Sequence, residues 1–125
     1  SLAIISLFIM SSFVGCNNKN KYDTTINFLN WGENIADGLI EEFQEKYNIG
    51  VNQIFVDDNE EMYQELISGK TQYDVVVPGD YLVERLIAEG RLEKLDKDNI
   101  PNASQLSEDN LNKPFDRGNV YSLLI

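Results

Sequence analysis

The residues best suited to bind a ligand are aromatic and acidic, and they fall in three short segments. Residues 30–34, 57–60 and 78–81 together contain the only Trp of the chain, one Tyr, five carboxylates and three Asn, but no Lys or Arg. An aromatic face attracts a cation, and a carboxylate pairs with an amino group. The segments therefore suit a cationic ligand, whereas an anionic solute would call for basic residues.

Two aromatic residues and two carboxylates are the strongest candidates for contact with that ligand. Trp31 and Tyr81 would supply aromatic faces, and Glu33 and Asp80 flank them with negative charge. Each also has an ordinary structural explanation, and both explanations stay open here. Trp31 could be a core residue at the end of a strand, and Tyr81 could pack in the first turn of a helix. Asp80 could be the N-cap of that helix, and Glu33 could be a solvated loop residue.

The composition excludes several classes of chemistry. The chain of 125 residues has no His, one Cys and a formal net charge of −11. Without His, zinc sites and His-based general bases are excluded, and a single Cys excludes an internal disulfide. The negative charge argues against binding along a nucleic-acid backbone, because phosphate neutralisation requires Lys and Arg. Gly32 and Gly79 stand alone, so there is no Gly-rich phosphate loop. We expect no enzyme activity, no metal and no cofactor.

Strand-like and helix-like segments alternate between residues 24 and 90. Stop signals at Asn48–Gly50, Gly69 and Gly90 follow apolar residues at helical spacing. The continuous apolar run Asp74–Val77 is typical of a strand that is buried on both faces. The expected strands are residues 25–29, 51–56 and 74–77; the expected helices are residues 35–47, a second helix capped by Asp57–Asn59, and a third helix capped by Asp80.

Three strand–helix units in a row predict an α/β fold with a parallel sheet between two layers of helices. In such a sheet, ligands bind at the carboxyl ends of the strands, where the three candidate segments are expected to meet. The regular pattern fades after Gly90. Leu92 and Leu95 are interpreted as a short edge, residues 107–112 as a short helix and residues 120–125 as a strand.

The N-terminal segment is interpreted as a targeting signal. An apolar run over residues 2–10 precedes small residues and Cys16, and the polar segment 17–21 follows. A helix of fifteen residues spans about 22 Å, which is short for a bilayer core of about 30 Å and right for a signal peptide. Gly15–Cys16 resembles the lipobox of bacterial lipoproteins, in which the Cys is acylated. The expected parts are a signal peptide at 1–15 and a lipidated Cys with a linker at 16–23; the alternative is a buried apolar helix with a core Cys.

Four motifs carry a resemblance to a family. These motifs, in order and correctly spaced, resemble the first lobe of the spermidine/putrescine-binding proteins, the solute receptors of polyamine ABC importers: Phe28–Trp31, Asp57–Tyr63, Tyr73–Pro78 and Leu111–Asp116. The resemblance implies that residues 24–125 are an incomplete first lobe of a two-lobed, periplasmic-binding-protein type II-like receptor. It also implies an ABC permease as partner, and a location in the periplasm or on the outer face of the cytoplasmic membrane through a lipid on Cys16.

The resemblance assigns roles in a polyamine site to individual residues. In this family, aromatic side chains sandwich the methylene chain and carboxylates grip the amino groups. Trp31 and Tyr81 fall on such aromatic positions. Asn34 stands where the family often has an aromatic residue, and Gly79 stands where it has a small polar residue, so a hydroxyl contact is lost. The expected ligand-binding residues are Trp31, Glu33, Asn34, Gly79, Asp80 and Tyr81.

Three alternatives remain open beside a polyamine receptor. Asn34 and Gly79 leave room for a receptor of the same fold that binds another small solute. An inactive truncated fragment would share the ancestry without the function. An enzyme would need a placed pair of carboxylates, since no nucleophile–base pair is visible without His.

Overall fold

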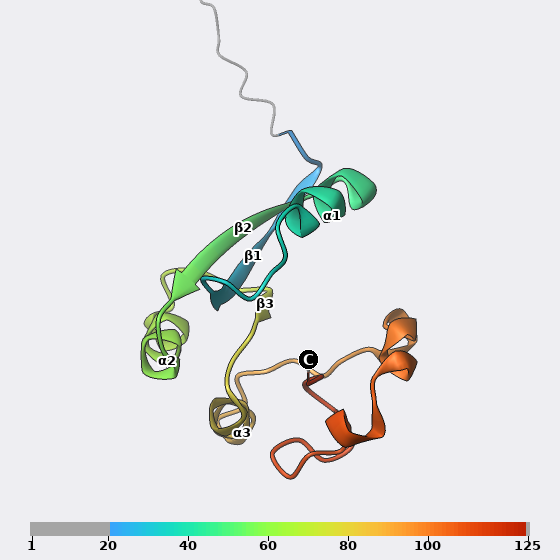
Figure 1. Cartoon of the computed structure of the whole chain (residues 1–125). Coiled ribbons are helices and arrows are strands. Elements are labelled where there is room, and N and C mark those ends of the chain that lie inside the picture. The colour runs from blue at the N-terminus through green and yellow to red at the C-terminus, as the bar shows by residue number, and fades with distance from the viewer. Residues whose placement is uncertain (1–20, 125) are drawn as a thin grey trace, which may run out of the picture.

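A parallel sheet carries the helices that position the candidate segments. The structure, a computed structural model, describes residues 21–124. Three strands, β1 (Thr24–Trp31), β2 (Ile49–Val56) and β3 (Val75–Val76), are all parallel and lie in the order β2-β1-β3. The helices that alternate with them are α1 (Leu39–Tyr47), α2 (Asn59–Ser68) and α3 (Asp80–Ala88) (Figure 1). The α/β class with a parallel sheet is therefore confirmed.

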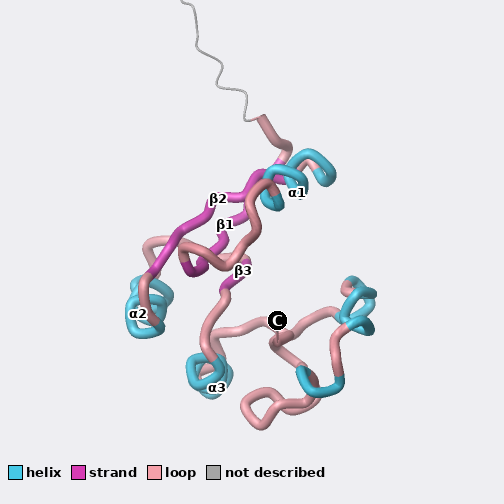
Figure 2. The backbone as a smooth tube through the Cα atoms, in the orientation of Figure 1, coloured by secondary structure: helices cyan, strands magenta, loops and turns pink. Residues whose placement is uncertain are grey.

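The hydrophobic core lies on one face of this sheet. Leu29 of the central strand is fully buried and packs with Met62 of α2 and with Leu82 and Leu86 of α3. Right-handed crossovers from β1 to β2 and from β2 to β3 place α1 on the opposite face from α2. In Figure 2, α1 lies apart from α2 and α3. The helices thus form two layers with the sheet between them.

Local side-chain and backbone signals fix the ends of the helices. Asp58 is the N-cap of α2, where its Oδ1 accepts a 2.8 Å hydrogen bond from the Glu61 backbone N–H. Glu61 in turn accepts a 2.8 Å bond from the Asp57 backbone N–H. Gly69 and Gly90, with φ near +67°, end α2 and α3 as predicted. A residue without a Cβ adopts this left-handed conformation at little cost.

The first helix is shorter than the sequence pattern predicts. Residues 35–38 are not helical, with a turn at 37 and 38, and α1 begins only at Leu39, because Gly38 takes the left-handed conformation with φ of 81°. The sequence predicts that residues 48–50 end this helix, but only the first of them does so. Asn48 is the left-handed C-cap of α1, whereas Ile49 and Gly50 already belong to β2.

The third strand and the C-terminal segment differ from expectation. Val75 is 47% exposed, so the run Asp74–Val77 is not buried on both faces, and only two of its residues form β3. Among the described residues, neither Leu92–Leu95 nor 120–124 forms a strand. One backbone bond, from Leu95 N to Val120 O at 2.8 Å, joins the two segments. The predicted helix over residues 107–112 is a 3-10 helix at Glu108–Asn110, after two others at Lys97–Asn99 and Pro101–Gln105.

Side-chain bonds to the backbone replace the strand that the sequence predicts near the C-terminus. The buried Asp116 carboxylate accepts hydrogen bonds from the backbone N–H groups of Val120, Tyr121 and Ser122 at 3.1, 3.0 and 2.7 Å. The Ser122 hydroxyl donates a further bond of 2.8 Å to it. Because these N–H groups point at Asp116, they cannot take part in a strand ladder.

The predicted targeting segment is outside the described part of the chain. The signal peptide at 1–15 and Cys16 fall before residue 21, and only the last residues of the linker at 16–23 are described. Between residues 21 and 124, no helix combines the length and the apolar character needed to cross a membrane.

Candidate ligand-binding site at the carboxyl edge of the sheet

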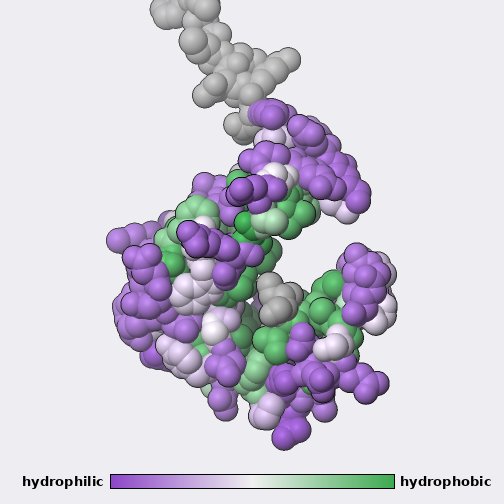
Figure 3. Space-filling model, in the orientation of Figure 1, coloured by the Kyte–Doolittle hydropathy of each residue, from purple (hydrophilic) through white to green (hydrophobic). Residues whose placement is uncertain are grey.

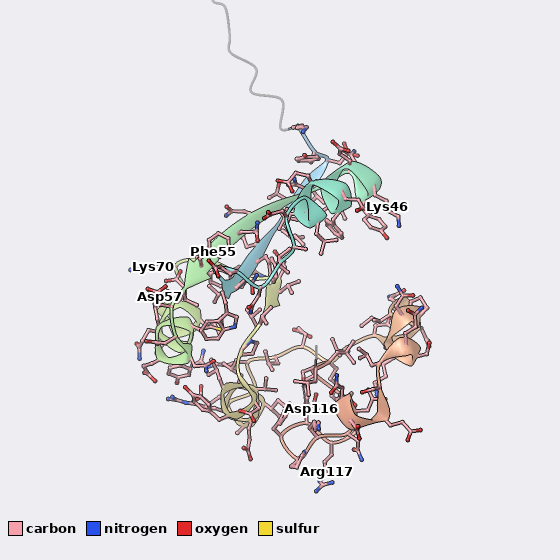
Figure 4. The ribbon with its side chains drawn as sticks, in the orientation of Figure 1. Lys46, Phe55, Asp57, Lys70, Asp116 and Arg117 are labelled. Carbon is pink, nitrogen blue, oxygen red and sulfur yellow. The ribbon has the colours of Figure 1, made fainter. Side chains whose placement is uncertain are left out.

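The three candidate segments meet at one edge of the sheet. In the strand register, Trp31 at the end of β1 pairs with Val56 at the end of β2, and Leu29 pairs with Val76 at the end of β3. The loops that follow the strands therefore start side by side. Phe55 and Asp57 mark this edge where β2 leads into α2 (Figure 4).

Trp31 joins the first loop to the third. Its indole ring is partly buried against the core cluster, and its Nε1 donates a 2.6 Å hydrogen bond to the Val77 backbone carbonyl. The side chain thus packs as a strand-end Trp would, and it stays at the loop edge where a ligand would bind. Its place in the core and its candidate role are compatible.

The third loop presents Tyr81 to solvent. Tyr81 is 55% exposed, so packing in the first turn of α3 covers only part of the residue. Asp80 is not the N-cap of α3, which corrects the sequence prediction. Gly79 holds that position, Asp80 is the first helical residue, and the Asp80 Oδ1 accepts a 2.7 Å bond from the Tyr81 backbone N–H. The negative charge of Asp80 lies in the first turn of α3, where the helix dipole favours it.

Asn59 connects the second loop to the third and was not singled out in the sequence. Its Oδ1 accepts a 2.8 Å hydrogen bond from the Gly79 backbone N–H. A Cβ at position 79 would lie 2.7 Å from the Asn59 Nδ2, so glycine is the residue that fits beside this amide. A larger residue at position 79 would require the Asn59 side chain to move. The sequence marked Asn59 only as part of a helix cap, and a contact across twenty residues leaves no local signal.

The first and second loops carry most of the negative charge of the edge. Glu33, Asn34, Asp57 and Glu60 are exposed, and no Lys or Arg stands within these loops. Exposed carboxylates can turn toward an ammonium group, and they attract cations to the edge before contact. Between residues 21 and 124, no group of acidic, Cys or His side chains is arranged to hold a metal ion.

Asn30 is the second residue that the sequence did not single out. It directly precedes Trp31 on the central strand and has an exposed fraction of 0%. Its side-chain Oδ1 and Nδ2 have no hydrogen-bond partner among residues 21–124. Nothing in the residue type marks a buried Asn in sequence, because most Asn side chains are exposed.

A hollow in the described structure lies mainly outside this edge. It has a volume of about 940 Å³ and follows β3, residues 90–96 and residues 121–124, and it reaches the candidate site at Val77, Pro78 and Asp80. Its surface is mostly hydrophobic (Figure 3). An apolar hollow along the edge of β3 does not suit a small, highly charged ligand, so the polar loops remain the better candidate site.

Curated relatives are similar to most of the chain. No family model matches it. The spermidine/putrescine-binding periplasmic protein 1 of Haemophilus influenzae is 36% identical and aligns with 96% of this chain and 37% of its own length. The spermidine/putrescine-binding periplasmic protein of Escherichia coli is 41% identical and aligns with 81% of this chain and 29% of its own. The chain thus spans about a third of the length of these relatives.

Solved structures agree with the sequence comparison. A putative spermidine/putrescine ABC transporter protein from Listeria monocytogenes is 34% identical, with a TM-score of 0.76, over 78% of this chain and 30% of that one. A spermidine/putrescine ABC transporter substrate-binding protein from Streptococcus pneumoniae is 32% identical, with a TM-score of 0.75, over the same shares. These matches confirm the resemblance seen in the four motifs: over about a third of their length, this chain is similar to the spermidine/putrescine-binding proteins of ABC transporters.

Proposed function

We propose that the chain is the first-lobe part of an extracytoplasmic solute receptor that binds a polyamine at the carboxyl edge of the sheet. The supporting observation is the combination at this edge of Trp31, held by Val77, with the exposed Tyr81 and with loop carboxylates free of Lys and Arg. The names of the relatives point to the same ligand class, spermidine and putrescine. This function is solute binding for transport, without catalysis.

The physical chemistry of a polyamine suits these residues. A diamine or triamine is a flexible cation with an apolar stem. An aromatic ring such as that of Trp31 or Tyr81 covers the stem and attracts the charge, with about 0.5–2 kcal/mol per cation. Glu33 and Asp80 would pair with the amino groups, and such pairs strengthen once water is excluded. In this proposal Asn34 and Gly79 line the same site through their loops.

Asn34 and Gly79 point to a second candidate function. Asn34 is an amide where the family often has an aromatic ring, and Gly79 leaves no hydroxyl to bind a ligand. A site with fewer aromatic faces and more amide groups would also accept a small polar solute. Competition between spermidine and small uncharged polar solutes separates the two candidates.

We further propose that a second lobe and a permease complete the transport cycle. Closure of two lobes around the ligand would exclude water from the loop carboxylates, and the closed form would be the state that an ABC permease recognises. The single lobe should bind weakly, because half of the site and its enclosure lie elsewhere.

Lipid attachment at Cys16 belongs to the same proposal. Two or three acyl chains would anchor the protein to the outer face of the cytoplasmic membrane, where one chain would hold it only reversibly. Mass spectrometry of the protein from a membrane fraction tests it directly. A mass increase confined to a peptide that begins with Cys16 is expected, and an unmodified Cys16 in that fraction would contradict it.

Substitution of the two aromatic residues tests ligand binding. In a full-length receptor that includes the second lobe, we expect Trp31→Ala and Tyr81→Ala each to weaken spermidine binding at least tenfold in calorimetry, because each removes a cation-binding face and stem contact. Tyr47→Ala is the matched control, since Tyr47 is also exposed but ends α1, away from the loops. Unchanged affinity in both site variants would refute the assignments.

Spermidine binding to this chain has its own control for charge screening. Trp31 is the only Trp, so its fluorescence reports on the candidate edge. A saturable change with spermidine that is absent with NaCl of equal ionic strength supports a specific site. An equal response to both would mean that the acidic surface is merely screened.

A further inference from the structure

Asn30 occupies a costly position for an amide side chain. It lies on the central strand directly before Trp31, is fully buried, and has no side-chain hydrogen-bond partner within residues 21–124. A buried polar group without a partner has given up its bonds to water and costs free energy. An apolar side chain of similar size would fit the strand at lower cost. The packing of the fold alone therefore does not account for an Asn at this position.

Asn30 faces the layer through which the loop from β1 to α1 passes. Side chains alternate along a strand, so Asn30 points away from the face on which Leu29 and Trp31 pack with the core. The crossover places α1 and residues 32–38, which lead to it, on that other face (Figure 2). The cross-strand neighbour of Asn30 is Phe55, which is 52% exposed, so this face is open on the β2 side.

The end of the loop 32–38 that is far from Asn30 carries two backbone hydrogen bonds, and residues 32 and 33, near Asn30, form a turn. The backbone bonds from Leu39 N to Ala36 O (3.2 Å) and from Glu42 N to Gly38 O (3.0 Å) belong to the start of α1. Glu33 and Asn34, at the end near the sheet, are exposed. This exposed segment follows Asn30 and Trp31 directly in the chain, so its backbone groups and the Asn30 amide, which lacks a partner, could satisfy each other.

We propose that Asn30 is a positioning residue for the candidate site. When a polyamine is bound, the Asn30 carboxamide hydrogen-bonds to the backbone of residues 32–38. This bond holds Glu33 and Asn34 against the ligand. The inference rests on the proposed function, because it needs a ligand that draws the loop inward. Asn30 then favours the bound arrangement of the loop over the arrangement seen here, and it supplies that preference without touching the ligand.

A titration of the isotope-labelled chain with spermidine, followed by NMR, tests this inference. In the wild type we expect spermidine to shift the side-chain NH2 signals of Asn30 and the backbone amide signals of residues 32–38. We also expect it to slow the exchange of these groups with solvent. Asn30→Leu removes the amide and keeps the size of the side chain. This variant should keep or raise the melting temperature and weaken spermidine binding about tenfold. It should also abolish the spermidine-induced shifts of residues 32–38, while the shift of Tyr81 remains.

The matched control is Asn52→Leu, on β2. Asn52 is exposed and donates a 3.0 Å side-chain bond to Asn27, away from the loops, so its spermidine affinity should match the wild type. Wild-type affinity and wild-type loop shifts in Asn30→Leu would overturn the inference and leave the proposed function standing. If Asn30→Leu does not fold, the wild type alone tests the inference. The inference is then overturned if spermidine changes the signal of the Trp31 indole but leaves the side-chain NH2 signals of Asn30 unchanged. A wild-type chain that responds to spermidine no more than to NaCl of equal ionic strength would refute the proposed function itself.

Discussion

The indole Nε1 of Trp31 lies 2.6 Å from the backbone carbonyl oxygen of Val77 and donates a hydrogen bond to it. This bond ties the end of the central strand to the loop that leads into α3. The orientation of the indole ring and the entry of α3 are therefore coupled. A residue proposed for ligand contact also holds two loops of its site together.

Trp31→Phe separates the hydrogen bond from the aromatic face. We expect the free energy of unfolding to fall by about 1–2 kcal/mol, because the bond to Val77 is lost and the smaller ring leaves a gap. Spermidine binding should weaken less than in Trp31→Ala, since a ring remains. Urea unfolding and calorimetry measure the two effects. Equal affinities for the Phe and Ala variants would show that the ring itself contributes nothing to binding.

Gly79→Ala should destabilise the protein through Asn59. The new Cβ would lie 2.7 Å from the Asn59 Nδ2, so the amide must move and its 2.8 Å bond from the Gly79 N–H is strained or lost. We expect a loss of about 1–2 kcal/mol in the free energy of unfolding. Combined with Asn59→Ala, the substitution should cost less than the sum of the two single effects, since the contact exists only once. Strict additivity in urea unfolding would contradict the coupling.

Asp116→Asn should loosen the C-terminal segment. The carboxylate accepts three backbone N–H groups and the Ser122 hydroxyl, and an amide can replace only part of this set. We expect a loss of about 2–3 kcal/mol in the free energy of unfolding and faster hydrogen exchange at Tyr121 and Ser122. Asp109→Asn, at an exposed position, is the control and should leave both quantities unchanged.

Glu89 makes part of the stability dependent on pH. Hydrogen bonds from Arg91 and Arg85 and from the Tyr63 hydroxyl lower the pKa of its carboxyl group, and the Arg91 bond has the largest effect. The folded state therefore favours the charged form. This stabilisation is complete above the ordinary pKa of a Glu and is lost as the pH falls toward the lowered value.

Glu89→Gln tests this pH dependence. The stability difference between wild type and variant should be present at pH 7 and should shrink as the pH falls below the ordinary Glu range. Thermal unfolding at a series of pH values measures it. A constant difference down to strongly acidic pH would show that the pair with Arg91 does not contribute. Glu93→Gln, which changes a nearby exposed carboxylate, controls for the change in net charge.

The parts of the fold that the sequence predicted correctly depend on local signals. The alternation of strands and helices follows from apolar spacing, and the ends at Asn48, Gly69 and Gly90 follow from residues that tolerate the left-handed conformation. The early start predicted for α1 was wrong because the apolar spacing suggested a helix from Ile35, while Gly38 takes a left-handed conformation and the helix begins only after it.

The features that the sequence did not predict depend on contacts between distant residues. The bond from Trp31 to Val77 joins residues 46 positions apart, and that from Gly79 to Asn59 joins residues 20 positions apart. Apolar residues near the C-terminus suggested a strand, but Asp116 captures the backbone N–H groups that the strand would use. The position of the candidate site was predictable, because parallel strands end at the same edge of the sheet. The hydrogen bonds between its loops were not predictable.

The parallel arrangement of the sheet also has a consequence for orientation at a surface. The chain enters β1 at Thr24, and the candidate loops begin at its other end, eight residues and about 25 Å away. An anchor before residue 21 would therefore attach to the end of the sheet opposite the candidate loops. If Cys16 carries the proposed lipid, the membrane attaches at this end of the sheet, and the candidate ligand-binding loops face away from the membrane.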